Sequence, residues 1–216
     1  MKIALIGASG FVGSAILKEL LHRGHQVTAI ARNPGKITSQ ENLEFLSADV
    51  MNETVLGKAV AGHDAVISAY NAGWQNPNLY TDFLKGSHAI QGAVKKAGVK
   101  RLIVVGGAGS LFLSPGQQIV DTEGFPDVWK PGALAARDYL DIIKQEKELD
   151  WTFLSPAIEM HPGTSGKRTG TYRTGLENPV TDTEGRSVIS VEDTAVAIAD
   201  ELERPKHIQK RFTAAY

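Results

Sequence analysis

The sequence contains no cysteine, and its 216 residues carry nearly balanced charge. The missing cysteines exclude disulfide bonds, thiolate nucleophiles and cysteine-based metal sites, and with them a disulfide-stabilised secreted fold. Because 23 basic residues face 24 acidic ones, no overall basic field exists to attract nucleic acid or an anionic membrane. We therefore expect a cytoplasmic protein with a small-molecule partner, without a nucleic-acid or membrane partner. No histidine or carboxylate spacing indicates a metal site.

Long hydrophobic runs are also missing. The first apolar stretch is interrupted by Gly7 and Gly10, well before a signal-peptide core or a membrane span would be complete. With 42% hydrophobic residues the chain can still bury a substantial core, and its length fits one domain over residues 1–216. Residues 162–187 are rich in glycine, threonine and arginine, so we expect residues 157–190 to form a small substrate-side lobe.

Short apolar runs alternate with longer amphipathic stretches, which predicts an α/β fold with a doubly wound parallel sheet of the Rossmann-like type. A capping box of Ser190 and Asp193 begins the last predicted helix. Strands are predicted at Lys2–Ile6, Gln26–Ala31, Leu43–Ser47, Ala65–Ala69, Arg101–Gly106, Trp151–Ser155 and Phe212–Ala214. Helices are predicted at Phe11–Arg23, Thr54–Ala61, Tyr80–Ala97, Gly132–Glu146 and Val191–Glu203.

The stretch IGASGFVG, residues 6–13, joins the first predicted strand to the first predicted helix. Such glycines permit a tight turn, a close approach of a pyrophosphate to the main chain, and packing of the helix against the strand. The spacing is GxxGxxG rather than GxGxxG, and the alternative is that the glycines serve only the turn and packing. The cofactor contacts predicted in this loop are Gly7, Ser9, Gly10, Phe11, Val12 and Gly13.

The end of the second strand indicates which dinucleotide binds. Arg32 stands where NAD sites often have an acidic residue, and Lys36 follows it, so NADP(H) is preferred and NAD(H) remains the alternative. Further contacts are predicted after the other strands, because ligands of parallel sheets bind at the carboxyl edge. They are Asp49, Val50, Ser68, Ala69, Tyr70, Gly107, Pro156 and Ala157.

Six segments together resemble the atypical short-chain dehydrogenase/reductase superfamily, in the branch with NmrA-like proteins and NADH-flavin reductases. They are IGASGFVGSAI, DAVISAYNAG, GVKRLIVVGGAGSL, LDWTFLSPA, ISVEDTAVAIADELE and RFTAAY. The resemblance covers essentially the whole chain and implies NAD(P)(H) lying across the carboxyl edge of a Rossmann-like sheet, beside a variable substrate lobe. The branch also includes sugar-nucleotide epimerases and dehydratases, so the reaction stays open.

The catalytic residues of the superfamily are matched only in part. Its typical members use a serine after the fifth strand, for which Ser110 is the candidate, and a tyrosine with a lysine four residues later. Here Tyr139 and Lys144 are five apart, which turns the helix by about 140° and separates the two side chains. Tyr139 is therefore either catalytic or a packing residue. His161, in the loop after the sixth strand, is a further candidate proton donor.

These features favour hydride transfer from NADP(H) to a flavin-like or other planar acceptor, since such an acceptor can take its proton from water. The alternatives are a non-catalytic NAD(P) sensor of the NmrA-like kind and an enzyme similar to sugar-nucleotide epimerases and dehydratases. Trp74 and Trp129 fit stacking on an acceptor ring, lid packing or a homodimer contact equally well. Arg168 and Arg173 are candidates for binding an anionic substrate such as a flavin phosphate, or are solvated charges.

Overall fold

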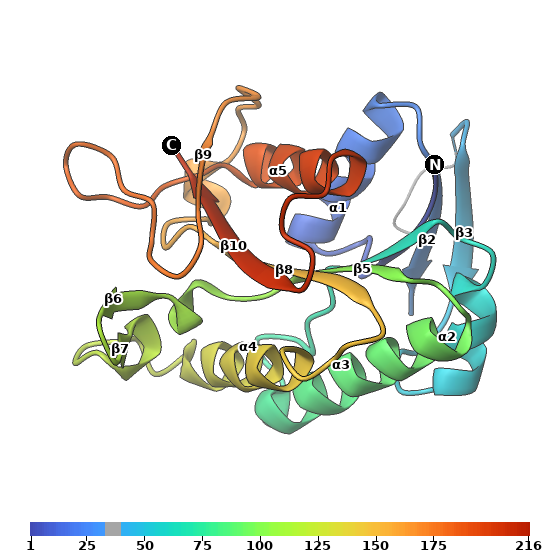
Figure 1. Ribbon diagram of the computed structural model, residues 1–216, viewed down its shortest axis with the longest axis horizontal. Coiled ribbons are helices and arrows are strands. Elements are labelled where there is room, and N and C mark those ends of the chain that lie inside the picture. The colour runs from blue at the N-terminus through green and yellow to red at the C-terminus, as the bar shows by residue number, and fades with distance from the viewer. Residues whose placement is uncertain (33–39) are drawn as a thin grey trace.

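A single eight-stranded sheet forms the centre of the computed structural model, which describes residues 1–32 and 40–216 (Figure 1). All neighbouring strands pair in parallel except the last, which is antiparallel to its neighbour. In spatial order the strands are β3 (Leu43–Ser47), β2 (Gln26–Ala31), β1 (Lys2–Ile6), β4 (Ala65–Ser68), β5 (Arg101–Val105), β8 (Asp150–Pro156), β10 (Lys210–Ala215) and β9 (Arg173–Gly175). The order reverses direction between β1 and β4, which is where parallel sheets bind their ligands.

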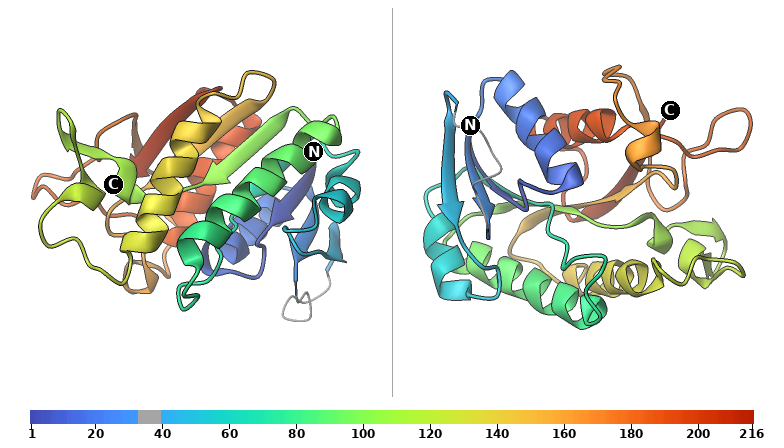
Figure 2. Two further views of the ribbon diagram at one scale, coloured as in Figure 1. Left: turned by 90° about the horizontal axis from the view of Figure 1, so that it is seen from below. Right: turned by 180° about the vertical axis from the view of Figure 1, so that it is seen from behind.

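Helices cover both faces of this sheet. On one face lie α1 (Phe11–His22) and α5 (Val191–Glu203), and on the other lie α2 (Glu53–Val60), α3 (Leu79–Lys96) and α4 (Lys130–Ile143). Figure 2 shows α3 and α4 side by side beneath the strands. A strand buried on both faces must be apolar along its whole length, which explains the unbroken run in β1.

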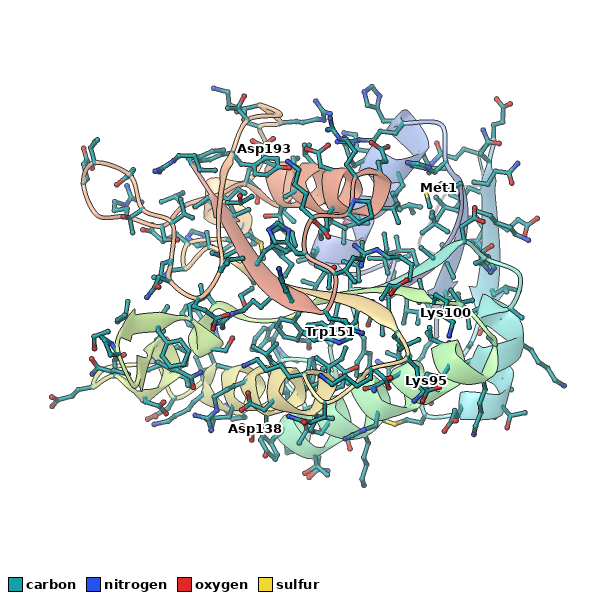
Figure 3. The ribbon with its side chains drawn as sticks, in the orientation of Figure 1. Met1, Lys95, Lys100, Asp138, Trp151 and Asp193 are labelled. Atoms are coloured by element: carbon teal, nitrogen blue, oxygen red, sulfur yellow. The ribbon has the colours of Figure 1, made fainter. Side chains whose placement is uncertain are left out.

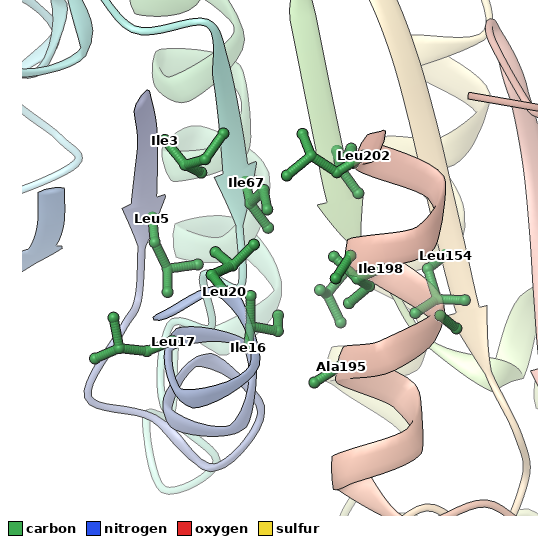
Figure 4. Close-up of a cluster of buried hydrophobic side chains, with 14 of the residues drawn as sticks. Ile3, Leu5, Ile16, Leu17, Leu20, Ile67, Leu154, Ala195, Ile198 and Leu202 are labelled. Atoms are coloured by element: carbon green, nitrogen blue, oxygen red, sulfur yellow. The ribbon is translucent and has the colours of Figure 1, made fainter. Parts of the chain in front are cut away.

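The core is divided by the sheet into two layers. Ile3 and Leu5 face α1 and α5, whereas the intervening Ala4 and Ile6 face α2 and α3, as the two-residue period of a strand requires. In the first layer the buried side chains of α1, among them Ile16 and Leu20, meet the sheet next to those of α5, among them Ile198 and Leu202 (Figure 4).

One crossover has the opposite hand to the others. The chain steps from β5 to β8 through α4 on one face, and then steps in the same direction from β8 to β10 through α5 on the other. Because right-handed crossovers are the rule, the β8–α5–β10 connection is the left-handed exception. This connection contains residues 157–190, so the chain has ample length to reach the far face and place α5 beside α1.

The predicted α/β fold class is confirmed, with shifts at element ends. The observed β4 and β5 stop one residue before the predicted ends, β10 is longer than predicted, and α4 begins and ends earlier. The short elements were not predicted, because runs of two or three residues are too short to show a periodicity. These are the strand β9, the hairpin of β6 (Phe112–Ser114) and β7 (Gln117–Gln118), and the 3-10 helices η2 (Ala108–Ser110), η3 (Ile119–Asp121) and η4 (Pro162–Thr164).

A buried carboxylate attaches the lobe to the domain. Asp193, at the start of α5 beside the lobe (Figure 3), accepts hydrogen bonds from the Thr169 amide at 2.9 Å, the Gly170 amide at 2.7 Å and the Tyr216 hydroxyl at 2.6 Å. Ser190 caps the helix by accepting from the Asp193 amide, as the capping box predicted, but the Asp193 carboxylate turns to the lobe instead. Burial raises the pKa of Asp193, yet these hydrogen bonds outweigh burial and hold the pKa below its usual value.

We predict that Asp193→Asn lowers the free energy of unfolding at pH 7 by about 2 to 3 kcal/mol, because charge-assisted hydrogen bonds to a buried acceptor are lost. A carboxyl group with a lowered folded-state pKa stabilises the protein above its unfolded pKa and loses this effect as the pH falls through the folded value. The difference from wild type should therefore shrink below about pH 4. Urea unfolding at several pH values measures it.

Asp141→Asn is the matched control, since Asp141 is 65% exposed and its partner among the described residues is Lys144, one helical turn away. It should change the free energy of unfolding by less than about 0.5 kcal/mol. Equal effects of the two substitutions would contradict the anchoring role of Asp193.

Candidate functional site

A cavity of about 510 Å³ opens at the carboxyl edge of the sheet, over the point where the strand order reverses. Its walls come from the segments that follow β1, β2, β3 and β4. Eight of the predicted cofactor contacts line it: Gly7, Ser9, Gly10, Arg32, Asp49, Val50, Ala69 and Tyr70. The sequence analysis did not single out Met51, Asn71, Asn76, Asp82 and Lys85, which also line it, because no motif marks these positions.

The glycine loop lies in direct main-chain contact with its neighbours. Gly7 has φ +79°, and a Cβ atom there would lie 2.5 Å from the carbonyl oxygen of Ala69 at the end of β4. A Cβ atom on Gly13 would lie 2.0 Å from the carbonyl oxygen of Gly7. Both glycines therefore bring backbone against backbone, so the turn and packing roles are real. Gly7 also lines the cavity together with Ser9 and Gly10, and these three residues form the glycine cradle.

The first turn of α1 faces this cradle with no side-chain cap. Its N-cap residue is Gly10, and the turn contains no acidic residue. The amide groups of a first turn have no partners within their own helix, and the helix dipole adds partial positive charge. This end of α1 can therefore bind an anion such as a pyrophosphate.

Arg32 and Asp49 stand at the outer part of the cavity. Arg32 directly follows β2, and its carbonyl oxygen accepts a hydrogen bond from the Ser47 hydroxyl at 3.1 Å, which ties the ends of β2 and β3 together. One carboxylate oxygen of Asp49 accepts from the Met51 amide at 3.0 Å. The cavity thus offers a cation and an anion to a ligand. Lys36, the predicted second cation, lies outside the described residues.

Tyr70 forms a rigid wall of the cavity. Its ring stacks on Phe83 at 5.9 Å, and its hydroxyl donates to the carbonyl oxygen of Asp82 at 3.0 Å. A Cβ atom on Gly86 would lie 2.5 Å from the ring, so the glycine makes room for it. Burial, followed by the nearby Asp82, raises the pKa of Tyr70 to about 12. The phenol therefore stays protonated at neutral pH.

The remaining predicted contacts lie at or near the strand ends, outside the walls of this cavity. Ser68 and Ala157 are buried at the ends of β4 and β8, Pro156 ends β8, and Gly107 is half-buried after β5. The Gly106 amide donates to the carbonyl oxygen of Leu154 at 2.8 Å, so the ends of β5 and β8 stay paired. Phe11 and Val12 begin α1, where Phe11 is exposed. The direct contacts assigned to these residues stay predictions.

Tyr139 is buried in the core, which favours its packing role over its catalytic one. It is 1% exposed, lies edge-on to Phe83, and donates its hydroxyl hydrogen to Gln91 on α3 at 3.3 Å. Burial raises the pKa of its phenol well above the usual value. The ring belongs to the apolar layer between the sheet and α4, and no side chain of the cavity wall contacts it among the interactions described.

The other two candidate catalytic residues are held by local structure. The Ser110 hydroxyl is buried and lies 3.3 Å from both the Gly107 carbonyl oxygen and the Ser155 hydroxyl. It faces the protein interior, which argues against a direct contact with substrate. His161 is exposed, and its Nδ1 accepts from the Gly163 amide to cap η4. Its role as proton donor stays a prediction.

The two loop arginines and the two tryptophans lie outside the walls of the cavity. Arg168 pairs with the buried Glu19, and Arg173 donates to the carbonyl oxygen of Thr181, so both arginines serve lobe contacts rather than form an open anion site. Trp74 and Trp129 are 58% and 55% exposed. A Cβ atom on Gly132 would lie 2.8 Å from the Trp74 ring, so Trp74 rests on the start of α4, within one turn of Trp129.

Residues 7–205 match the model of the NAD(P)H-binding family. The chain belongs to this family. A proposed epimerase from Bacteroides thetaiotaomicron is 48% identical with a TM-score of 0.91, and covers 100% of this chain and 96% of its own. A protein from Burkholderia pseudomallei described as exported is 44% identical, with a TM-score of 0.88 and full coverage of both chains. A proposed NADH-flavin reductase from Streptococcus pneumoniae TIGR4 is 35% identical, with a TM-score of 0.87 and coverage of 100% and 99%.

The family and the fold support a nicotinamide dinucleotide as the ligand of the cavity. Of the helices in residues 1–32 and 40–216, none is long and apolar enough to cross a membrane. The same residues contain no cluster of histidine, aspartate and glutamate side chains arranged to hold a metal ion.

We predict that Gly7→Ala destabilises the protein by about 2 to 4 kcal/mol, because strain at positive φ adds to a clash with the Ala69 carbonyl. Gly24→Ala is the control, since Gly24 has φ +78° with nothing within 4 Å of the added atom. It should cost only about 1 kcal/mol. Urea unfolding measures both, and calorimetry should show weaker NADPH binding for Gly7→Ala alone. Equal losses would refute the close approach.

Proposed function

We propose that this protein is an NADP(H)-dependent oxidoreductase that transfers hydride to a flavin-like or other planar acceptor. The observation that carries the proposal is the cavity over the β1–β4 reversal, which combines the glycine cradle, an uncapped helix end and Arg32. The first two features suit the pyrophosphate of either nicotinamide dinucleotide, and Arg32 suits the 2′-phosphate of NADP(H). The family match and the Streptococcus neighbour's description as an NADH-flavin reductase support the same class of reaction.

The residues at the carboxyl edge suggest how the dinucleotide is divided among them. Gly10 and the first turn of α1 would hold the pyrophosphate, while Arg32, Asp49 and Tyr70 would surround the adenosine. The nicotinamide end would then lie over the ends of β5 and β8, near Gly107, Pro156 and Ala157. When bound, the nicotinamide supplies the hydride, and the main chain of these turns aligns it with the acceptor.

The preference for NADP(H) rests on Arg32. A guanidinium at the end of β2 can bind a 2′-phosphate through two parallel hydrogen bonds, whereas an acidic residue there would bind the ribose hydroxyls of NAD(H). The Streptococcus neighbour is described with NADH, so NAD(H) is the outcome that would correct this part of the proposal.

The planar acceptor is supported by the buried position of Tyr139 and by two exposed aromatic rings. Tyr139 is buried in the core, which disfavours alcohol dehydrogenation and epimerisation, since both need a placed acid or base. A flavin takes its proton from water and needs only stacking and alignment. Trp74 and Trp129 offer exposed ring surface near the start of α4.

A non-catalytic NAD(P) sensor is the second candidate, favoured by the inward-facing hydroxyls of Ser110 and Tyr139. An epimerase-like enzyme is the third, on the description of the Bacteroides neighbour. We propose a cytoplasmic location, in keeping with a chain that forms no disulfide bonds, and the alternative is export, as described for the Burkholderia relative. A homodimer formed over Trp129 would be the competing use of that exposed ring.

We predict that the purified protein binds NADPH more tightly than NADH and oxidises it when FMN, riboflavin or a quinone is present. Parallel calorimetric titrations followed by absorbance assays of the same samples test both points. Tight binding without turnover would replace the oxidoreductase with the sensor. Failure to bind either dinucleotide would overturn the proposal altogether.

We further predict that Arg32→Ala weakens NADPH binding by about 1.5 to 3 kcal/mol, since a charge-assisted phosphate contact is lost, and leaves NADH binding almost unchanged. Lys18→Ala removes the same charge from the exposed side of α1, outside the cavity wall, and serves as control. Equal losses for both dinucleotides would refute the assignment of Arg32.

A further inference from the structure

A buried arginine lies directly beneath the turn that follows β5. Arg211, on β10, is 3% exposed. Its Nη1 donates to the carbonyl oxygen of Ser110 at 2.7 Å and to the Ser110 hydroxyl at 3.1 Å. Its Nη2 donates to the carboxylate of Glu177, which belongs to the lobe just after β9. One guanidinium thus joins the turn after β5 to the lobe.

The surroundings of Arg211 connect the same parts a second time. Its guanidinium carbon lies over the Phe112 ring, 5.9 Å from the centroid, and the Phe112 amide donates to the Glu177 carbonyl oxygen at 2.9 Å. The Asn178 side chain donates back to the Phe112 carbonyl oxygen at 2.7 Å. The β6–β7 hairpin, the lobe and the turn after β5 therefore form one hydrogen-bonded unit around a single cation.

Stability alone is a poor explanation for a charge in this place. Burying a guanidinium costs free energy, and a well-packed apolar side chain is often at least as stabilising as a buried ion pair. Arg211 Nε and the Thr213 hydroxyl, two residues along β10, are buried without partners among the described residues, so the site is not optimised for hydrogen bonding. The negative partner, Glu177, is half exposed and sits on a lobe rather than on the sheet.

The contacts of Ser110 show what the charge achieves. Its hydroxyl accepts from Arg211 and lies within hydrogen-bond distance of the Gly107 carbonyl oxygen, so both ends of the turn are held together. Gln118 of β7 donates to the same Ser110 carbonyl oxygen at 3.0 Å. Ser110 thus fixes the buried end of the turn, whereas residues 106–108 stay partly exposed beside the end of β8.

We propose that Arg211 is a positioning residue, which fixes the turn of residues 107–110 and makes its geometry depend on the lobe through Glu177. The inference rests on the proposed function, in which this turn aligns the nicotinamide with the acceptor. A displacement of about 1 Å at such a wall can cost up to about 100-fold in rate. Binding of the acceptor to the lobe would thereby change the position of the turn beside the nicotinamide.

The experiment compares Arg211→Met, Arg211→Lys and Glu177→Gln with the control Arg101→Met. Arg101 is also a buried arginine with an unpartnered Nε, bonded to Thr152 and paired with Glu201. It starts β5, at the opposite edge of the sheet from the cavity. Loss of Arg101 should cost stability without reaching the turn. The readouts are the Kd for NADPH, the kcat and KM with FMN, and amide hydrogen exchange of the peptide 106–111.

For Arg211→Met we expect kcat with FMN to fall by about 10-fold or more and KM for FMN to rise, because alignment is lost. The Kd for NADPH should change by a smaller factor than kcat, since the wall that would hold the pyrophosphate and the adenosine lies on other strands. Arg211→Lys should recover part of kcat, because an ammonium group can hold the Ser110 carbonyl but not Glu177 as well. Exchange at 106–111 should be faster in Arg211→Met and in Glu177→Gln, and unchanged in Arg101→Met.

Wild-type kinetics in Arg211→Met, or the same kinetic and exchange pattern in Arg101→Met, would overturn the inference. If the wild-type protein reduces no acceptor, the proposed function fails and the exchange data decide alone. Faster exchange at 106–111 on substitution of Glu177 would then still support the coupling between lobe and turn. Unchanged exchange in both Arg211→Met and Glu177→Gln would refute it.

Discussion

The close approach of two backbone segments is the constraint on which the rest of the structure depends. Gly7 lies against the end of β4, and Gly13 lies against Gly7, so the first helix starts directly on the two central strands. This contact sets where α1 begins, and its uncapped first turn therefore faces the reversal of strand order. Helix dipole, open amides and main-chain surface then coincide at one place, which is what a pyrophosphate requires.

Buried charge adds to the apolar packing of Met160, Tyr172 and Val180 in attaching the lobe to this frame. At the start of α5, Asp193 accepts hydrogen bonds from the Thr169 and Gly170 amides of the lobe and from the hydroxyl of Tyr216, the final residue. Arg211 donates hydrogen bonds to Ser110 in the turn after β5 and to Glu177 in the lobe, and it lies against the Phe112 ring of the hairpin. The segment around residues 162–187 has few apolar side chains to bury, so directional bonds to buried ions supplement its apolar packing.

The chemistry of the site follows from how its hydroxyl groups are used. Tyr139 and Ser110, the residues that typical members of the superfamily would need for acid–base work, both direct their hydroxyls into the protein. Tyr70, which does line the cavity, has a pKa raised by burial, so its phenol is a weaker acid than a free tyrosine. The cavity wall then consists of main chain, the Tyr70 ring and both basic and acidic side chains, among them Arg32 and Asp49.

The sequence by itself determined the sheet and the cradle, because both depend on local patterns. Apolar runs bounded by turns predict buried parallel strands, and glycines between a strand and a helix have few other uses. Eight of the predicted contacts accordingly line the cavity. The five-residue spacing of Tyr139 and Lys144 already weakened the catalytic pair, but only packing showed that Tyr139 is a core residue.

Tertiary structure decided everything that joins distant segments. The hand of the β8–α5–β10 crossover, the addition of β9 at the edge, and the wall residues Asp82 and Lys85 have no periodic or motif signature. The same is true of Arg211, which in sequence is one more basic residue near the end of the chain. Its structural role depends on Ser110 and Glu177, which contact it from other parts of the fold. Contacts between segments far apart in the chain arise only when the sheet brings their edges together, so local patterning determines the strands and the cradle, and three-dimensional packing determines their partners.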